Sequence, residues 1–198
     1  FMPASQIIAI SILAFLLFWA VGAYNRLIRL RNEITNAFAQ IDVQLKRRHD
    51  LIPNLVEVAR KFLEHERDTL ERVTAARAQV IAATDLVKTR PNQSGPIQSL
   101  SMAEGVLASA MTQFKAVVEA YPELKADQNM RELSEELTHT ENKVAFSRQL
   151  FNDVTLDYNN AAHQFPTNLV ANLFGFKTAA MLQATQTEAE RAPVKVSF

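Results

Sequence analysis

Two histidine-containing runs carry the residue types of metal sites. His65 and Glu66 begin a run like HExxH, in which two histidines one helical turn apart hold zinc, but Thr69 stands where the second histidine is needed. Glu136 and His139 have the ExxH spacing of di-iron bundles, which require a second ExxH on another helix. The chain has no second ExxH. We therefore expect no metal site in one chain, with a site shared between copies as the alternative, and interpret Glu136 and His139 as solvated.

The composition argues against other classes of chemistry. The chain has no cysteine, which excludes thiolate nucleophiles, thiolate metal sites and disulfides. Its four glycines are scattered and form neither a phosphate-binding loop nor a GxSxG motif. Lysine and arginine together number 21, as do aspartate and glutamate, whereas nucleic-acid-binding domains are usually basic. We expect a protein that is not an enzyme, has no cofactor and binds no nucleic acid.

An apolar N-terminal stretch has the length of a transmembrane helix. No charged side chain precedes Arg26, and residues 7–23 are nearly all apolar. Trp19 and Tyr24 lie near the end of this stretch, where aromatic rings favour the lipid headgroups. A cleaved signal peptide is the alternative, but no lysine or arginine precedes the apolar run. We predict a membrane anchor at residues 1–24.

Positive charge after the anchor predicts its orientation. Arg26, Arg29 and Arg31 follow the apolar run directly, and cytoplasmic flanks carry the excess of lysine and arginine. We therefore expect a single-pass protein of the bacterial inner membrane, with the N-terminus outside and the C-terminal domain in the cytoplasm.

Apolar residues at spacings of three and four predict long helices beyond the anchor. The first is continuous with the anchor and ends near Lys46, Arg47 and Arg48, whose charges suit a helix C-terminus. The second begins at Asp50 as the N-cap, with Pro53 in its first turn. A loop over residues 84–98 follows, then helices over residues 100–121 and 127–164. The fold class is all-α: an antiparallel four-helix bundle at residues 25–176, continuous with the transmembrane helix.

The end of the bundle carries an uncharged apolar segment, residues 165–176. The last helix runs back toward the anchor, so this segment is expected near the bilayer. It either touches lipid or a neighbouring subunit, or caps the core of the bundle. The expected membrane-interface residues are Trp19, Tyr24, Arg26, Arg29, Phe165, Leu169, Phe174 and Phe176. Residues 177–198 form a tail that we expect to order on a partner.

Several motifs resemble the LemA family of bacterial membrane proteins. They are QIDVQLKRRHDLIPNLV at residues 40–56, YPELKA at 121–126, TENKVAFSR at 140–148, DYN at 157–159, and the segment 165–176. The resemblance implies an N-terminal anchor, a cytoplasmic antiparallel helical bundle and no established catalytic activity. Some members are associated with membrane-compartment formation, and family genes often lie beside those of membrane peptidases.

Polar residues on the last predicted helix coincide with these motifs. Buried polar side chains in a bundle usually fix the pairing of its helices, so we expect contacts between helices or between subunits from Glu141, Asn142, Arg148, Asn152, Tyr158 and Asn159.

The leading functional hypothesis is a non-enzymatic membrane scaffold. Long amphipathic helices, an anchor that confines copies to two dimensions and the lack of a credible active site favour self-association at the membrane, with lipid and further copies as partners. The alternatives are an adaptor of a membrane peptidase, which would be a membrane-protein partner, and an enzyme with a cofactor inside the bundle.

Overall fold

The computed structural model describes residues 3–182, which form six helices and no strand. Three long helices cover the first two thirds of this part: α1 (Ala4–Arg60), α2 (Arg67–Thr89) and α3 (Ser94–Ala120). The short α4 (Pro122–Ala126) leads into the long α5 (Gln128–His163), and α6 (Thr167–Leu173) follows. The predicted all-α fold class is confirmed, and the apolar N-terminal stretch continues into the body as one long helix.

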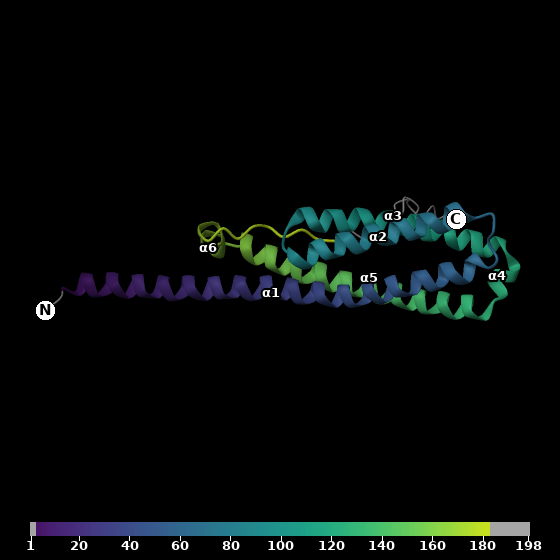
Figure 1. Cartoon of the computed structure of the whole chain (residues 1–198). Coiled ribbons are helices and arrows are strands. Elements are labelled where there is room, and N and C mark those ends of the chain that lie inside the picture. The colour runs from purple at the N-terminus through teal and green to yellow at the C-terminus, as the bar shows by residue number, and fades with distance from the viewer. Residues whose placement is uncertain (1–2, 183–198) are drawn as a thin grey trace, which may run out of the picture.

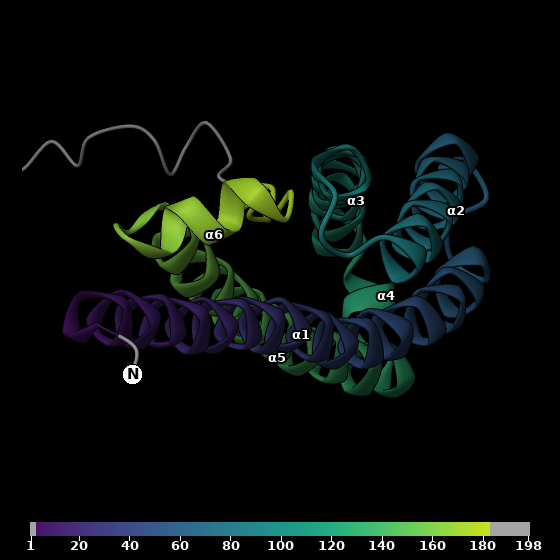
Figure 2. The ribbon, with the colours of Figure 1, turned by 90° about the vertical axis from the view of Figure 1, so that its left-hand side faces the viewer.

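The helices form an elongated rod with a single helix protruding at one end (Figure 1). The helices α1 and α5 run antiparallel and pack along each other over the longest contact, while α2 and α3 form a second antiparallel pair. The two pairs meet mainly where α1 contacts α2. Figure 2, viewed along the rod, shows α5 beside α1 and α6 close to α1. The N-terminal part of α1 extends alone beyond this body.

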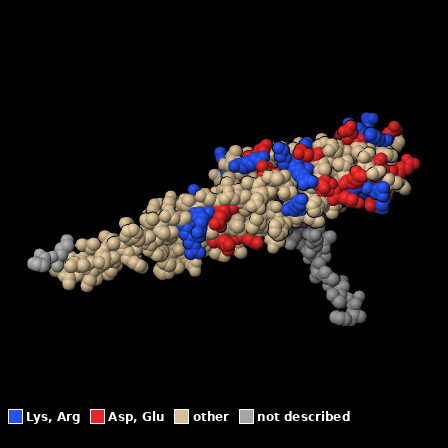
Figure 3. Space-filling model, turned by 90° about the horizontal axis from the view of Figure 1, so that it is seen from below, with Lys and Arg blue, Asp and Glu red and all other residues tan. Residues whose placement is uncertain are grey.

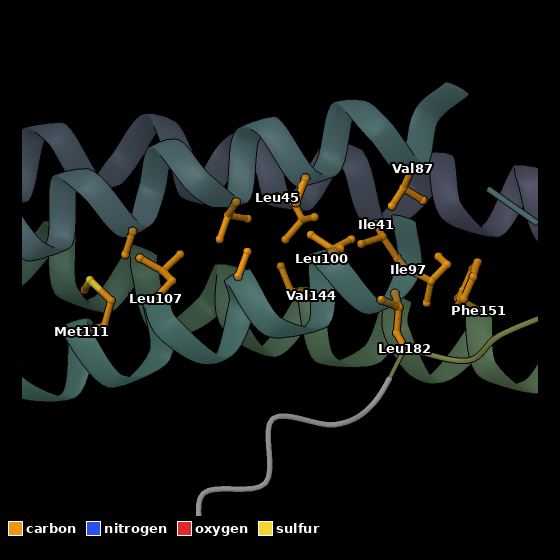
Figure 4. Close-up of a cluster of buried hydrophobic side chains, with 14 of the residues drawn as sticks. Ile41, Leu45, Val87, Ile97, Leu100, Leu107, Met111, Val144, Phe151 and Leu182 are labelled. Carbon is orange, nitrogen blue, oxygen red and sulfur yellow. The ribbon is translucent and has the colours of Figure 1, made fainter. Parts of the chain in front are cut away.

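One hydrophobic core runs through the body of the rod. Its side chains come from α1, α2, α3 and α5, and also from the segment after α6 (Figure 4). Phe38 of α1 and Phe151 of α5 pack edge to face, with ring centroids 6.1 Å apart. Because this pair fixes the antiparallel register, the residues of α1 and α5 that lie side by side have numbers that sum to about 189.

The corner between α3 and α5 follows local sequence signals. Pro122 opens α4, where the missing N–H of proline costs no helical hydrogen bond. Asp127 then caps α5, its carboxylate accepting a hydrogen bond of 2.9 Å from the backbone N–H of Met130. The helix predicted over residues 127–164 is therefore confirmed at both ends within one residue.

The predicted break near residue 50 is wrong, because α1 continues to Arg60 with Pro53 inside it. A proline within a helix leaves the carbonyl four residues earlier without its N–H donor. That carbonyl belongs to His49, and Nε of Arg77 on α2 donates a hydrogen bond of 2.7 Å to it. A neighbouring helix thus supplies the donor that Pro53 lacks, and the turn lies at residues 61–66 instead.

Replacing Arg77 with Met is expected to destabilise the fold by about 1–3 kcal/mol, because the half-buried His49 carbonyl loses its donor. In a Pro53→Ala background the restored backbone N–H supplies that donor, so the same replacement costs less. Urea unfolding of the four chains of this double-mutant cycle, in one mild detergent, measures the difference. Equal costs of the Arg77 replacement in both backgrounds would show that Arg77 does not compensate for Pro53.

Two further expectations need correction. The loop predicted over residues 84–98 is shorter, since α2 extends to Thr89 and α3 begins at Ser94. We expected it beside the lipid, but Lys88 lies 2.9 Å from the Asp42 carboxylate of α1. Asp42 is eighteen residues beyond Tyr24, or roughly 27 Å along a helix, so the turn is remote from the end of the apolar stretch.

The basic cluster at residues 46–48 does not end a helix, because it lies in the middle of α1. Arg47 pairs with Glu136 of α5, and Arg48 is buried against Glu104 of α3. These arginines connect helices rather than cap one. Sequence periodicity alone did not separate the two roles, because the acidic partners are far away in the chain.

Candidate functional site

The N-terminal third of α1 presents apolar side chains to its surroundings. It is the one helix among residues 3–182 that is long and apolar enough to cross a membrane, and only 6 % of its most apolar window is buried. A core helix of a soluble protein would be mostly covered. Figure 3 shows that this narrow end of the rod is free of charged side chains up to a first group of basic ones.

A second exposed apolar surface, here called the foot, comprises residues 165–174 with α6 at its centre. The helix α6 buries Thr167, Val170 and Ala171 against the body. The large apolar side chains in and beside α6 are exposed instead. Their exposed fractions are 76 % for Phe165, 58 % for Leu169, 79 % for Leu173 and 57 % for Phe174. A segment that served only to cap the core would bury these side chains, because they are the ones that gain most from leaving water.

Aromatic contacts hold the foot beside the end of the apolar stretch. The Tyr24 ring on α1 lies 4.9 Å from the Phe174 ring and 5.6 Å from the Phe176 ring, measured between centroids. The Arg31 guanidinium lies 5.7 Å from the Phe176 centroid, within the range of a cation–π contact. The foot and the first arginines after the apolar run are therefore at the same height along the rod.

The other predicted interface residues lie on the same part of α1. Trp19 is half-buried, and Arg26 and Arg29 are exposed. Arg29 Nε lies 3.9 Å from the carboxylate of Glu33, one turn further along. Such an exposed pair contributes little to stability. Because its side chain is exposed, the guanidinium of Arg29 remains accessible to anionic groups.

The chain's similarity to known proteins covers the body and the foot. The sequence profile of the LemA family matches residues 37–198. The chain belongs to the LemA family. It is 28 % identical over 168 residues to Protein LemA of Metamycoplasma hominis, a match that covers 85 % of this chain and 72 % of that protein. This LemA-family chain also resembles the Magnetosome protein MamQ of Magnetospirillum gryphiswaldense, at 23 % identity over 88 % of this chain and 71 % of the relative.

Magnetosome protein MamQ 2 of Paramagnetospirillum magneticum is similar to the same degree, at 23 % identity over 91 % of this chain and 73 % of its own length. The profile match begins inside α1, after the apolar stretch, and includes the foot. The part of the chain that matches the family therefore includes most of the body of the rod.

A buried charge cluster crosses the body of this LemA-family fold. Arg48 of α1 and Glu104 of α3 form an ion pair in which both residues are 8 % exposed. Arg148 of α5 lies beside the pair: burial lowers the pKa of its guanidinium, the charge of Glu104 opposes that change, and the charge of Arg48 adds to it. One carboxylate thus serves two cations, in a groove lined by α1, α3 and α5.

His49 lies next to this cluster and is buried without a charge partner of its own. Neither ring nitrogen has a hydrogen-bond partner within residues 3–182. Burial, followed by the positive charge of Arg48, lowers the pKa of the imidazole from 6.5 to about 4. The ring is therefore neutral in the folded protein at neutral pH and behaves as a core side chain.

Acidification is expected to weaken the fold through His49. Its pKa is lower in the folded chain than in the unfolded chain, so between these values the unfolded state binds more protons and stability falls as the pH falls. The expected loss between about pH 7.5 and pH 5 is on the order of 2 kcal/mol. Urea unfolding of the wild type and of His49→Gln at both pH values measures it. Equal pH dependence in the two chains would contradict this role of His49.

The predicted polar residues of α5 make three kinds of contact. Glu141 lies 3.3 Å from the Lys115 amine of α3. The Asn142 side chain is exposed to solvent. Asn152, Tyr158 and Asn159 all bond to the main chain of residues 177–182, an extended segment that follows the foot. The sequence indicated polar contacts on this helix, but not that their partner would be an extended segment.

The residues considered for metal chemistry lie apart. His65 and Glu66 precede α2, which begins at Arg67, so the run 65–69 does not lie on one helical face. The Tyr121 hydroxyl donates a hydrogen bond of 3.5 Å to Glu66. Glu136 pairs with Arg47, and His139 is exposed. Within residues 3–182 no three histidine, aspartate or glutamate side chains are grouped to hold a metal ion.

Proposed function

We propose that this chain is a non-enzymatic, membrane-anchored helical scaffold that self-associates at the bacterial inner membrane. The observation that carries the proposal is the pair of exposed apolar surfaces, the N-terminal third of α1 and the foot, which meet at Tyr24. Two membrane contacts at one height restrain the tilt of the rod as well as its position. The relatives named as magnetosome proteins support a membrane-associated role.

The proposal includes the orientation of the rod. Arg26, Arg29 and Arg31 follow the apolar stretch of α1 at the height of the foot. Cytoplasmic flanks of membrane helices are enriched in such residues. The proposed arrangement has the N-terminus outside and the body, from Arg26 onward, in the cytoplasm.

Self-association is supported by exposed apolar side chains on the flank of the rod. Val43 of α1 and Phe146 of α5 are both exposed, and their numbers sum to 189, which is the register that pairs Phe38 with Phe151. The two side chains therefore lie at about the same level along the rod, and each is open to a neighbouring copy. Copies anchored in one membrane meet at high effective concentration, so a small lateral contact is sufficient.

The experiment is a mass measurement of the full-length chain in lipid nanodiscs large enough for several copies. We expect discrete assemblies, which Phe146→Glu reduces and Gln149→Glu, at an exposed polar position of the same helix, leaves unchanged. A chain that begins after Tyr24, and so lacks the anchor, tests the contribution of the anchor. Monomers at every lipid-to-protein ratio would contradict the scaffold and favour the adaptor hypothesis, in which a second membrane protein co-purifies with the chain.

A further inference from the structure

The segment that follows the foot is held on α5 through its main chain. Asn159 accepts a hydrogen bond from the Ala179 N–H and donates one to the Ala179 carbonyl, both of 2.9 Å. Asn152 makes the same two bonds, also of 2.9 Å, with the N–H and carbonyl of Leu182. The Tyr158 hydroxyl donates a further hydrogen bond of 2.9 Å to the Lys177 carbonyl.

The spacing of the two asparagines matches an extended chain. Seven residues of helix separate Asn152 from Asn159, a rise of roughly 10.5 Å. Three residues separate Ala179 from Leu182, which in an extended chain is roughly 10 Å. Each amide side chain therefore pairs with one residue of the segment as a neighbouring strand would. The two amides recognise main-chain groups at two fixed positions of the segment.

Side chains of the segment add a simple sequence preference. Ala179 and Leu182 are buried, whereas Lys177, Thr178 and Met181 are exposed. Leu182 belongs to the core cluster that contains Ile97 of α3 and Phe151 of α5 (Figure 4). The site thus takes a small residue followed, three positions later, by a leucine. Its occupant also completes the core between α3 and α5.

We propose that Asn152 and Asn159 form an exchangeable binding site for this segment, and that in the membrane the segment of one copy occupies the site of a second copy. The inference rests on the proposed self-association and specifies the contact that makes it. A second copy carries the fitting segment by identity, and exchange of an identical element forms the same bonds in both arrangements. Anchored copies also present site and segment at the same height above the membrane.

The connection between the foot and the segment permits this exchange. Gly175 adopts φ of 70°, a conformation open to glycine at little cost, and it separates α6 from the extended residues. The chain from Gly175 to Ala179, the first residue that an asparagine holds, reaches roughly 13 Å when extended. The segment can therefore reach the site of an adjacent rod where the two sites face each other across about that distance.

The experiment uses the absence of cysteine from the chain. One full-length variant carries Met181→Cys, and another with a different tag carries Leu156→Cys, an exposed position of α5 between the two asparagines. Both are reconstituted together in vesicles and treated with a short bismaleimide. We expect a cross-linked species that contains both tags. It should be at least tenfold weaker when Leu156→Cys is replaced by Thr138→Cys, an exposed position of α5 remote from the site.

Variants of the site identify its role. Asn152→Asp combined with Asn159→Asp removes both amide donors and places carboxylates against main-chain carbonyls, so it should abolish the mixed cross-link. Asn142→Asp, on the exposed face of the same helix, should leave it unchanged. A chain carrying both cysteines reports the intramolecular arrangement. If the nanodisc masses show assemblies while cross-links form only within single chains, the exchange is refuted and self-association stands. If the chain is monomeric, both are refuted.

Discussion

Replacing Glu104 with Gln is expected to lower the free energy of unfolding by about 3–5 kcal/mol. The change preserves shape but removes the carboxylate that pairs with Arg48, so the buried Arg48 guanidinium loses its counter-charge. A charge that is buried and unpaired costs far more than the ion pair itself contributes. Urea unfolding in one mild detergent, followed by the helical circular dichroism signal, measures the change.

A surface pair provides the matched control. Glu141→Gln removes the same charge from the partly exposed pair with Lys115, which joins α5 to α3, and should cost less than about 1 kcal/mol. Arg48→Met combined with Glu104→Leu removes both charges of the buried pair and should cost less than Glu104→Gln alone. A Glu104→Gln chain as stable as the Glu141→Gln chain would show that water reaches the cluster and that Arg48 is not buried in solution.

The sequence predicted the elements whose signals are local. The helix α5 was placed correctly because Asp127 is an N-cap at its start and its apolar stripe continues to its end. The long apolar helix at the N-terminus was evident from the lack of charge before Arg26. In both cases the residues that determine the element lie within it or next to it, so no knowledge of tertiary contacts was needed.

The sequence did not predict elements whose determinants are distant. Pro53 is a strong local signal for a helix start, yet α1 passes through it because Arg77, on another helix, bonds to the freed carbonyl. Arg48 resembled a surface cap because its partner Glu104 is 56 residues away. Only the three-dimensional arrangement separates a buried arginine from a solvated one of the same local sequence.

The polar residues of α5 illustrate a further limit. Asn152 and Asn159 were among the polar residues from which we expected contacts between helices or between subunits. Their partner is an extended segment with no periodic signal of its own. A pair of asparagines with helical spacing that matches a three-residue extended step is the pattern by which such a site can be sought in other sequences.

For the foot, the sequence identified the segment but not its exposed face. Residues 165–176 were recognisable as apolar and uncharged, and their position near the anchor followed from the chain reversals. Whether they covered the core or touched lipid depended on which side of α6 packs on α1 and α5. In the structure the small side chains face inward and Phe165, Leu169 and Leu173 face outward, which is the observation behind the proposed lipid contact.

The foot is expected to enter the lipid headgroup region. An environment-sensitive fluorophore on Leu169→Cys or Leu173→Cys should show blue-shifted emission in vesicles and strong quenching by a lipid-borne nitroxide. The same label on Thr138→Cys, exposed in the remote half of α5, should remain in water. Nanodiscs that hold a single copy keep neighbouring subunits from producing the shift. A label at the foot that is as accessible to water as the control would contradict the membrane contact.

Removal of the apolar side chains should then release the foot. Serine at positions 165, 169, 173 and 174 removes four large side chains, each contributing about 1.5–3 kcal/mol when fully buried, so on the order of 6 kcal/mol of membrane attraction is lost. This corresponds to roughly a 10⁴-fold change in the partition of the foot. A label at the exposed Asn172→Cys should move from lipid to water, while the anchor holds the chain in the membrane. Because anchor and foot are separate contacts, a rod that loses the foot stays bound but is free to tilt, which should also weaken the lateral assemblies that need neighbouring rods in register.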